Sequence, residues 1–303
     1  MGAFVVTGES GLEHLTLLGV SPPDFVTIAA GAGFTSVGLR ISPATDGERP
    51  WPVWPGSPML AETVRRCADT GLAVLDVEAV RLGPRAAGTR GTPEYGPVLE
   101  AAGELGARYV NAICDDPDLS RLSDSFARLV AAAAQYGIRA VVEFMAYRSV
   151  ATLEQAVAIA ARSGGGGILV DALHVQRCGV RLAALRAVDP GLFSYVQLCD
   201  APLRAPADPL REARAGRLLP GEGELPLLDL LDALPGGILV AVEAPAEASA
   251  EARADADGSD PVEFTARADA DGASSEEFAA QAEFAARARR ALDLVLSQAK
   301  ERG

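Results

Sequence analysis

The sequence of 303 residues predicts one domain, a closed (β/α)8 barrel of eight parallel strands that spans residues 1–303. Strand-like and helix-like runs alternate from end to end, which is typical of parallel α/β folds. The strand-like runs are rich in Val, Leu and Ile without strict alternation, as expected for strands buried on both faces. The chain is also longer than the roughly 250 residues that such a barrel needs.

Eight apolar runs are the predicted strands, in chain order 15–20, 36–41, 73–81, 107–114, 139–145, 167–173, 194–199 and 237–243. Helical patterns separate them, among them 58–70, 95–105, 123–136, 152–163 and 226–234. Thr152 and Gln155 have the spacing of a capping box at a helix start. Glycines stand where helices should end, at Gly71, Gly106, Gly137 and Gly164.

One segment breaks the alternation between the last strand and the last helix. From Ala246 to about Ser274 the chain is rich in Ala, Asp and Glu, and the hexamer Arg-Ala-Asp-Ala-Asp-Gly begins at both Arg253 and Arg267. We expect an acidic loop over 246–274 within the barrel domain, disordered because it has too few apolar residues to offset the entropy of ordering. The last helix is expected to start near Ser274, with Glu277 completing a capping box, and to run to about Lys300.

The amino-acid composition limits the kinds of binding partner that we expect. The net charge of −14 disfavours nucleic acid, because binding a phosphate backbone requires a basic surface. No apolar run approaches the ~20 residues that span a bilayer, so we expect no membrane partner. The four cysteines show no paired spacing, which favours reduced thiols and a cytoplasmic location. The sequence is also compatible with a homo-oligomer.

Polar side chains mark the ends of four predicted strands. Glu143, Asp171, Gln197 and Glu243 each stand near the C-terminal end of an apolar run. Parallel strands in a barrel end at the same mouth, where barrels of this kind place their chemistry. We therefore expect these four side chains to converge. The alternative is that they are ordinary polar residues at strand ends, but several buried acids without a cation would be costly.

Carboxylate and amide oxygens are ligands for hard divalent cations, so Mn²⁺ and Mg²⁺ are the first candidates, followed by Co²⁺ and Zn²⁺. Such a cation would polarise a carbonyl compound, and a nearby carboxylate, Glu143 or Glu243, would remove the acidified α-proton. His174 lies three residues after Asp171 and could bond a substrate hydroxyl or act as an acid. Further substrate-binding candidates near strand ends are Arg40, Arg81 and Asn111.

The stretches Val141-Val-Glu-Phe, Val170-Asp-Ala-Leu-His, Tyr195-Val-Gln-Leu-Cys-Asp-Ala-Pro, Leu219-Pro-Gly-Glu-Gly-Glu-Leu and Val242-Glu resemble the sugar phosphate isomerase/epimerase family of xylose isomerase-like TIM barrels. The resemblance covers about residues 15–245. It implies one divalent ion held by Glu143, Asp171, Gln197 and Glu243, with both glutamates also acting as bases and His174 contacting substrate. The epimerases also carry an Arg soon after the third ligand, and Arg204 does not align cleanly with it.

The resemblance also leaves the reaction open. The third ligand in ketose 3-epimerases is usually His, whereas Gln197 resembles hydroxypyruvate isomerases and dehydratases acting on 3-dehydroshikimate or keto-inositol. The leading hypothesis is an isomerase or epimerase of a small polyhydroxy carbonyl compound that works through an enediolate. The alternatives are a metal-dependent dehydratase and a non-catalytic barrel that binds a metabolite or a partner. Two histidines disfavour an apurinic-site endonuclease of the same fold, which holds three zinc ions.

Overall fold

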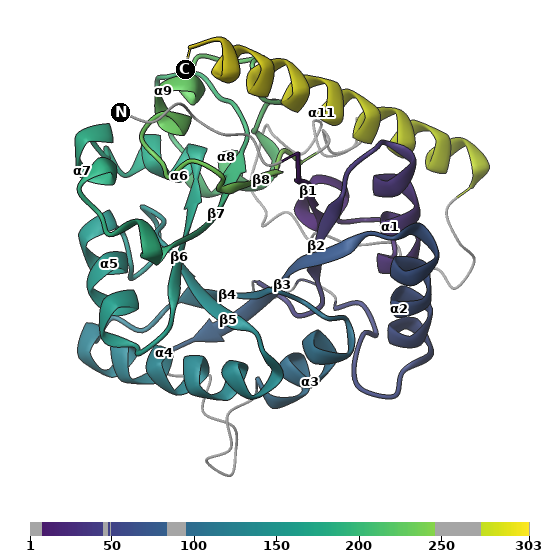
Figure 1. Cartoon of the computed structure of the whole chain (residues 1–303), viewed down its shortest axis with the longest axis horizontal. Coiled ribbons are helices and arrows are strands. Elements are labelled where there is room, and N and C mark those ends of the chain that lie inside the picture. Colours follow the sequence, from purple (N-terminus) through teal and green to yellow (C-terminus); the bar gives the residue numbers. More distant parts are fainter. Residues whose placement is uncertain (1–7, 45–47, 49, 84–94, 246–273, 303) are drawn as a thin grey trace.

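The computed structural model describes residues 8–44, 48, 50–83, 95–245 and 274–302. Eight parallel strands form one closed ring in chain order, so the predicted (β/α)8 barrel is confirmed (Figure 1). The strands are β1 Ser10–Glu13, β2 Ser36–Arg40, β3 Ala73–Leu82, β4 Tyr109–Cys114, β5 Arg139–Glu143, β6 Gly167–Asp171, β7 Phe193–Leu198 and β8 Leu239–Val242. The ring closes where β1 pairs with β8, Gly11 being opposite Ala241.

Helices surround the ring and cover its outer face (Figure 1). Their bounds are α1 Pro22–Gly31, α2 Pro58–Thr70, α3 Gly96–Glu104, α4 Leu119–Ala133, α5 Leu153–Arg162, α6 Ala172–Arg177, α7 Leu182–Arg186, α8 Pro209–Ala215, α9 Leu227–Leu231 and α11 Ser275–Arg302. The capping box at the start of α5 is confirmed, since Thr152 and Gln155 bond each other's backbone N–H groups. Gly71 and Gly137 end their helices with positive φ, as predicted.

The first predicted strand is wrong. The apolar run 15–20 forms part of a short 3₁₀ helix, His14–Leu17, and the turn after it, whereas the strand is the preceding segment Ser10–Glu13. That strand contains one large apolar side chain, Leu12, and a steric reason keeps its neighbour Gly11 without a side chain. A Cβ on Gly11 would lie 2.9 Å from the Cβ of Ala241 on β8. The close approach of β1 and β8 thus removes the apolar pattern by which a strand is recognised.

Two apolar layers hold the barrel together. The larger lies between the strands and the helices and includes Phe25, Phe126 and Leu292. A smaller cluster fills the barrel interior, with Leu75, Val141, Leu169, Tyr195, Leu239 and Ala241. Burying these side chains supplies the main stabilising free energy of the fold, at roughly 25 cal/mol per Å² of apolar surface. The interior is therefore a packed core below the mouth.

The last helix is confirmed, since α11 begins at Ser275 with the predicted bonds between Ser274 and Glu277. It packs against α1, α9 and β8 and so joins the two ends of the chain (Figure 1). The predicted acidic loop, apart from Ser274, lies outside the described residues. Within the described part of the chain, no helix is both long and apolar enough to cross a membrane.

Candidate functional site

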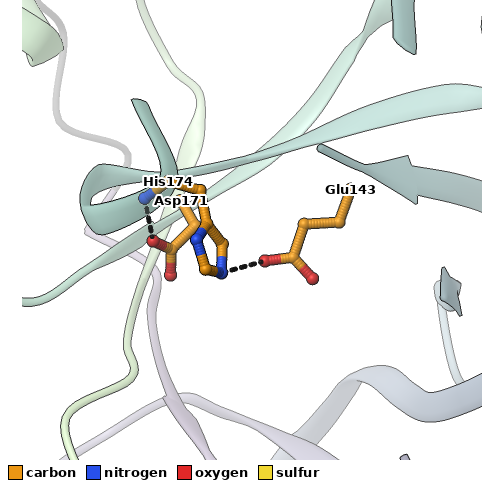
Figure 2. A group of neighbouring side chains, drawn as sticks. All are labelled: Glu143, Asp171 and His174. Carbon is orange, nitrogen blue, oxygen red and sulfur yellow. Dashed lines mark hydrogen bonds and ion pairs between the residues drawn. The ribbon is translucent and has the colours of Figure 1, made fainter. Parts of the chain in front are cut away.

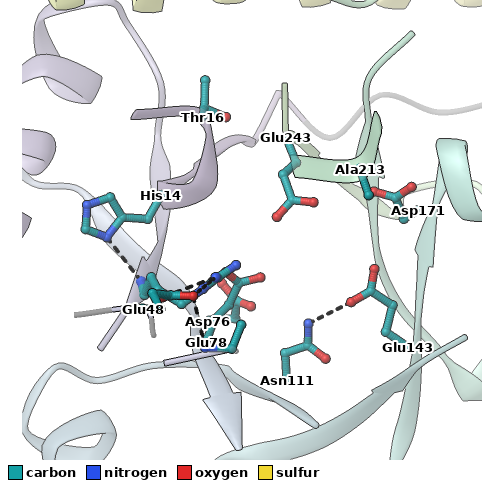
Figure 3. A network of polar contacts seen from close by, with 12 residues as sticks. His14, Thr16, Glu48, Asp76, Glu78, Asn111, Glu143, Asp171, Ala213 and Glu243 are labelled. Atoms are coloured by element: carbon teal, nitrogen blue, oxygen red, sulfur yellow. Dashed lines mark hydrogen bonds and ion pairs between the residues drawn. The ribbon is translucent and has the colours of Figure 1, made fainter. Parts of the chain in front are cut away.

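The four predicted ligands lie at the C-terminal mouth of the barrel. Glu143 and Asp171 are the last residues of β5 and β6, Gln197 lies on β7 opposite Asp171, and Glu243 directly follows β8. None of the four side chains belongs to a residue more than 6% exposed. Figure 3 shows Glu143, Asp171 and Glu243 around one central space. The strand-end pattern thus brings residues separated by about 100 positions to one place.

Glu143, Asp171 and His174 form the tightest group at this mouth (Figure 2). Each offers one ligand atom, and these atoms all lie within 4.8 Å of one another. Asp171 caps the first turn of α6 by accepting a hydrogen bond from the backbone N–H of His174 at 2.9 Å. This cap turns the imidazole toward β5, where its Nε2 lies 3.5 Å from Oε1 of Glu143. The ring of His174 thus offers a nitrogen donor beside the carboxyl group of Glu143.

Gln197 is buried without a hydrogen-bond partner. Its residue is 0% exposed, and neither its amide oxygen nor its amide nitrogen bonds any described residue. A buried amide left unsatisfied costs about 1–3 kcal/mol. A ligand at the mouth would recover this free energy, so the orphaned amide is an independent indication that the site takes a group from outside the chain.

Arg217 is the residue that sequence reasoning missed. Its Nη1 lies 2.5 Å from Oδ2 of Asp171 and 2.9 Å from Oε2 of Glu243, and its side chain is 2% exposed. Its Nε donates to the backbone oxygen of Ala213 at 2.7 Å. Arg204, by contrast, is exposed. Arg217 follows α8 and stands twenty positions after Gln197, so only the path of the intervening chain brings it to the mouth.

The buried ionisable groups at the mouth shift one another's pKa values. Burial and the nearby charge of Asp171 raise the pKa of Glu143 to about 8. Burial also raises the pKa of Glu243 well above its usual range, against the effect of Arg217. Burial opposes ionisation of Asp171 too, but Arg217 and His174 outweigh it, and the pKa of Asp171 is lowered. Burial lowers the pKa of His174 to about 4, so its imidazole is neutral at pH 7.

These residues fit a divalent cation. Carboxylate oxygens, an imidazole nitrogen and an amide oxygen are donors that Mn²⁺, Co²⁺ and Zn²⁺ accept. Arg217 engages Oδ2 of Asp171 and Oε2 of Glu243, one oxygen of each carboxylate. The amide oxygen of Gln197 has no competing described partner.

The predicted substrate-binding residues separate into two groups. Arg40 and Asn111 line the pocket at the mouth, together with His174, whereas Arg81 does not line it and bonds Asp115 at 3.4 Å. Asn111 donates from Nδ2 to Oε2 of Glu143 at 3.0 Å and so orients that carboxyl group. Arg40 is held by two bonds to Glu78, from Nε at 2.8 Å and Nη2 at 2.7 Å.

A second acidic group comes from β1 and β3. Glu13, Asp76 and Glu78 each offer a carboxylate oxygen within 4.8 Å of the others (Figure 3 shows Asp76 and Glu78). Asp76 accepts a hydrogen bond from the hydroxyl of Tyr195 at 2.6 Å. Gly38 leaves the room that this group needs, because a Cβ there would overlap carboxylate oxygens of Glu13 and Asp76. Burial raises the pKa of Asp76 to about 7 and that of Glu13 well above its usual range.

A family model described as "Xylose isomerase-like TIM barrel" matches residues 26–267. Among curated proteins, the comparison finds no match. Several solved structures share the fold. A xylose isomerase-like TIM barrel/4-hydroxyphenylpyruvate dioxygenase fusion protein has a TM-score of 0.71 and 19% identity over 97% of this chain, which spans 44% of that protein. The IOLI protein, whose structure holds a zinc atom, has a TM-score of 0.67 and 18% identity, covering 96% of this chain and 98% of its own.

Two further structures carry named reactions. D-psicose 3-epimerase from Clostridium cellulolyticum H10, solved with D-tagatose, has a TM-score of 0.62 and 14% identity, covering 95% of this chain and 98% of its own. The probable 3-DHS dehydratase AsbF from Bacillus anthracis has a TM-score of 0.62 and 13% identity, covering 77% of this chain and 91% of its own. At these identities the likeness shows the fold.

Proposed function

Since the chain belongs to the xylose isomerase-like TIM barrel family, we propose that it is a divalent-metal-dependent isomerase or epimerase of a small sugar or another hydroxy-carbonyl compound. One observation carries this proposal: Glu143 and Glu243 reach the same pocket from β5 and β8, strands that are not neighbours in the ring. Two carboxyl groups that approach a substrate from separate strands can remove a proton at one place and return it at another.

Glu143, Asp171, Gln197 and Glu243 would hold the ion, and His174 is a further donor beside Glu143. When bound, the ion would polarise a substrate carbonyl and make the neighbouring C–H group more acidic. Mn²⁺ and Mg²⁺ are our first candidates because oxygen donors dominate this set. Co²⁺ and Zn²⁺ are also compatible with it, since the imidazole of His174 suits both.

The proton would move between the substrate and the carboxyl groups. Glu143 or Glu243 takes the α-proton, which leaves an enediolate, and the other glutamate or His174 returns a proton. Asn111 keeps Glu143 in position through its 3.0 Å hydrogen bond. His174, which lines the pocket and is held by the cap from Asp171, would contact a substrate hydroxyl.

A dehydratase is the second candidate, and Gln197 is compatible with it as well as with a hydroxypyruvate isomerase. The dehydratases that the sequence resembles have Gln at the third ligand position, where ketose 3-epimerases usually have His. The first step is the same in both reactions, because the α-proton next to a ketone is removed. In a dehydratase, loss of a β-hydroxyl follows, and the product is a conjugated enone. The two reactions therefore differ in their products and share their site.

The test joins metal content to proton exchange. Purified wild-type protein, Glu143→Gln and Glu243→Gln are compared by mass spectrometry for bound metal after incubation with Mn²⁺. Each is then incubated in D₂O with a panel of ketoses and keto-acids, including 3-dehydroshikimate, and NMR follows deuterium entering at the α-carbon. Glu222→Gln is the matched control, since Glu222 is an exposed glutamate that pairs with Arg287 outside the pocket.

We expect about one ion per wild-type chain, weaker metal retention in both site variants, and exchange that falls by about 10²-fold or more without either glutamate. The Glu222 control should match the wild type. Exchange with no loss of mass supports the isomerase or epimerase, whereas a product lighter by one water with enone absorbance supports the dehydratase. A wild-type protein that binds no Mn²⁺ and exchanges no proton would instead be a non-catalytic binding barrel.

A further inference from the structure

The guanidinium groups around the pocket differ in how they are paired. Four arginines line it: Arg40, Arg148, Arg214 and Arg217. Arg40 bonds Glu78 and Glu48, Arg217 bonds Asp171 and Glu243, and Arg148 bonds Asp115 at 2.6 Å. Arg214 has no hydrogen bond or ion pair with any residue in the described ranges. Among the residues that the structure describes, one positive charge at the mouth is therefore left without a hydrogen-bonded or ion-paired partner.

Arg214 is not a solvated surface arginine. It lies in the last turn of α8, is half-buried, and faces the pocket beside Tyr147 and Arg148. Burial and the positive charges of Arg148 and Arg40 lower the pKa of the Arg214 guanidinium, against the opposing effects of Tyr147 and Glu48. Holding an unpaired cation in such a place costs free energy unless an anion joins it. In a chain with a net charge of −14, the missing acidic partner needs a specific reason.

Arg148 adds an open donor on the same wall. Its Nη1 donates to Oδ1 of Asp115 at 2.6 Å and its Nη2 to the backbone oxygen of Ala44 at 3.5 Å. Its Nε is buried and bonds no acceptor in the described residues. Asp115 fixes the guanidinium group of Arg148. An acceptor that binds its Nε–H group would therefore cost little additional side-chain entropy. The pocket thus offers the five N–H donors of Arg214 and one from Arg148.

We propose that the pocket binds a substrate that carries an oxyanion, either a carboxylate or a phosphate, and that Arg214 receives this group together with Nε of Arg148. Guanidinium groups match both anions because their planar N–H pairs fit two oxygens at once. Arg214 precedes Arg217 by three residues, which places the anion subsite next to the proposed metal ligands. The inference rests on the proposed function, whose substrate class it narrows to anionic hydroxy-carbonyl compounds.

The experiment compares ligands that share a hydroxy-ketone group and differ in whether they carry a neutral hydroxymethyl group, a carboxylate or a phosphate. One set is dihydroxyacetone, hydroxypyruvate and dihydroxyacetone phosphate, and the other is D-fructose, D-fructuronate and D-fructose 6-phosphate. Calorimetry gives the dissociation constant of each with Mn²⁺-loaded protein at low and high salt. The variants are Arg214→Gln, Arg214→Lys and, as a control, Arg211→Gln, because Arg211 lies exposed on the same helix.

In at least one set, we expect an anionic member to bind about tenfold or more tightly than its neutral counterpart, with an advantage that shrinks at high salt. Arg214→Gln should remove most of this advantage, Arg214→Lys should keep part of it, and Arg211→Gln should leave it intact. The affinity of the neutral members should stay within about twofold in all variants. The better anion identifies the head group as a carboxylate or a phosphate.

The inference is overturned if no anionic member binds better than its neutral counterpart, including the case in which none binds. It is also overturned if the advantage survives Arg214→Gln. Deuterium exchange on the same compounds separates this inference from the proposed function. An Arg214-dependent advantage without exchange on any compound supports the anion subsite and contradicts the enediolate chemistry. Exchange on any of the compounds, without an Arg214-dependent advantage for an anionic member, supports the chemistry and contradicts the subsite.

Discussion

Arg217 donates from Nη1 to Oδ2 of Asp171 at 2.5 Å, and both side chains are almost completely buried. The same nitrogen lies 2.9 Å from Oε2 of Glu243. A cation of the chain itself therefore compensates two carboxylates that we propose as ligands of a divalent ion. The site is stabilised without an ion, and an incoming ion must bind next to a fixed positive charge.

Replacing Arg217 should change ion affinity and stability in opposite directions. Arg217→Met removes the repelling charge, so calorimetry should show Mn²⁺ binding about tenfold or more tightly. It also leaves two buried carboxylates unpaired, and the metal-free protein should lose about 3–5 kcal/mol of unfolding free energy in urea titrations. Arg204→Met, at an exposed position, should change neither quantity. Weaker Mn²⁺ binding by Arg217→Met would show that Arg217 mainly orients the ligands.

Mn²⁺ binding should release protons near neutral pH. The pKa of Glu143 is about 8 in the metal-free protein, so this carboxyl group is mostly protonated at pH 7 and must ionise to bind the ion. Affinity should rise from about pH 6 to about 8, by up to tenfold per pH unit for each proton released. Calorimetry in two buffers of different ionisation enthalpy counts the protons. Glu143→Gln should release one proton fewer, and an unchanged count would contradict this assignment.

Asp76 should make the protein less stable as the pH rises. Its pKa is about 7 in the folded chain against 3.8 for an ordinary aspartate, so folding favours the protonated form. The stability that this proton provides is complete below about pH 4 and is lost as the pH rises toward about 7. Asp76→Asn keeps the shape of the side chain and can still bond Tyr195. It should reduce the loss of unfolding free energy with rising pH by up to about 1.4 kcal/mol per pH unit.

Urea titrations between about pH 4 and 7.5 measure how the unfolding free energy changes with pH. Asp124→Asn is the control, because Asp124 is exposed on α4 and should leave the slope as it is. If wild type and Asp76→Asn lose stability in parallel over this range, then Asp76 is ionised in the folded protein and another group neutralises it.

Apolar strand runs make most of this fold predictable. Strands β3 and β5 contain the apolar runs Ala73-Val-Leu and Ala140-Val-Val, and their predicted starts at Ala73 and Arg139 are those of the structure. Strand β1 could not be recognised, because Leu12 is its single large apolar side chain and the close contact with Ala241 requires a glycine at position 11. Whether 1–303 is one domain that includes the acidic 246–274 segment stays a prediction.

The apolar strand runs also predict the locations of several residues at the mouth. A polar residue that ends an apolar parallel strand lies at the mouth, so the locations of Glu143 and Asp171 could be predicted, while their metal-binding and catalytic roles stay predictions. Arg217 and Arg214 could not be predicted, since they come from the segment after β7 whose path depends on packing. Glu13 also escaped notice, because its strand was not recognised.

The pairing of β1 with β8 determines when the barrel can close during synthesis. The two strands are separated by more than 220 residues, and α11 covers their seam from the C-terminal side. During synthesis, the growing sheet keeps a free edge on β1 until the final strand emerges from the ribosome, and free edges invite pairing with other chains. Glu243 arrives with that same strand. The mouth therefore cannot be assembled before β8 has been made, and the β1 edge stays unpaired until then.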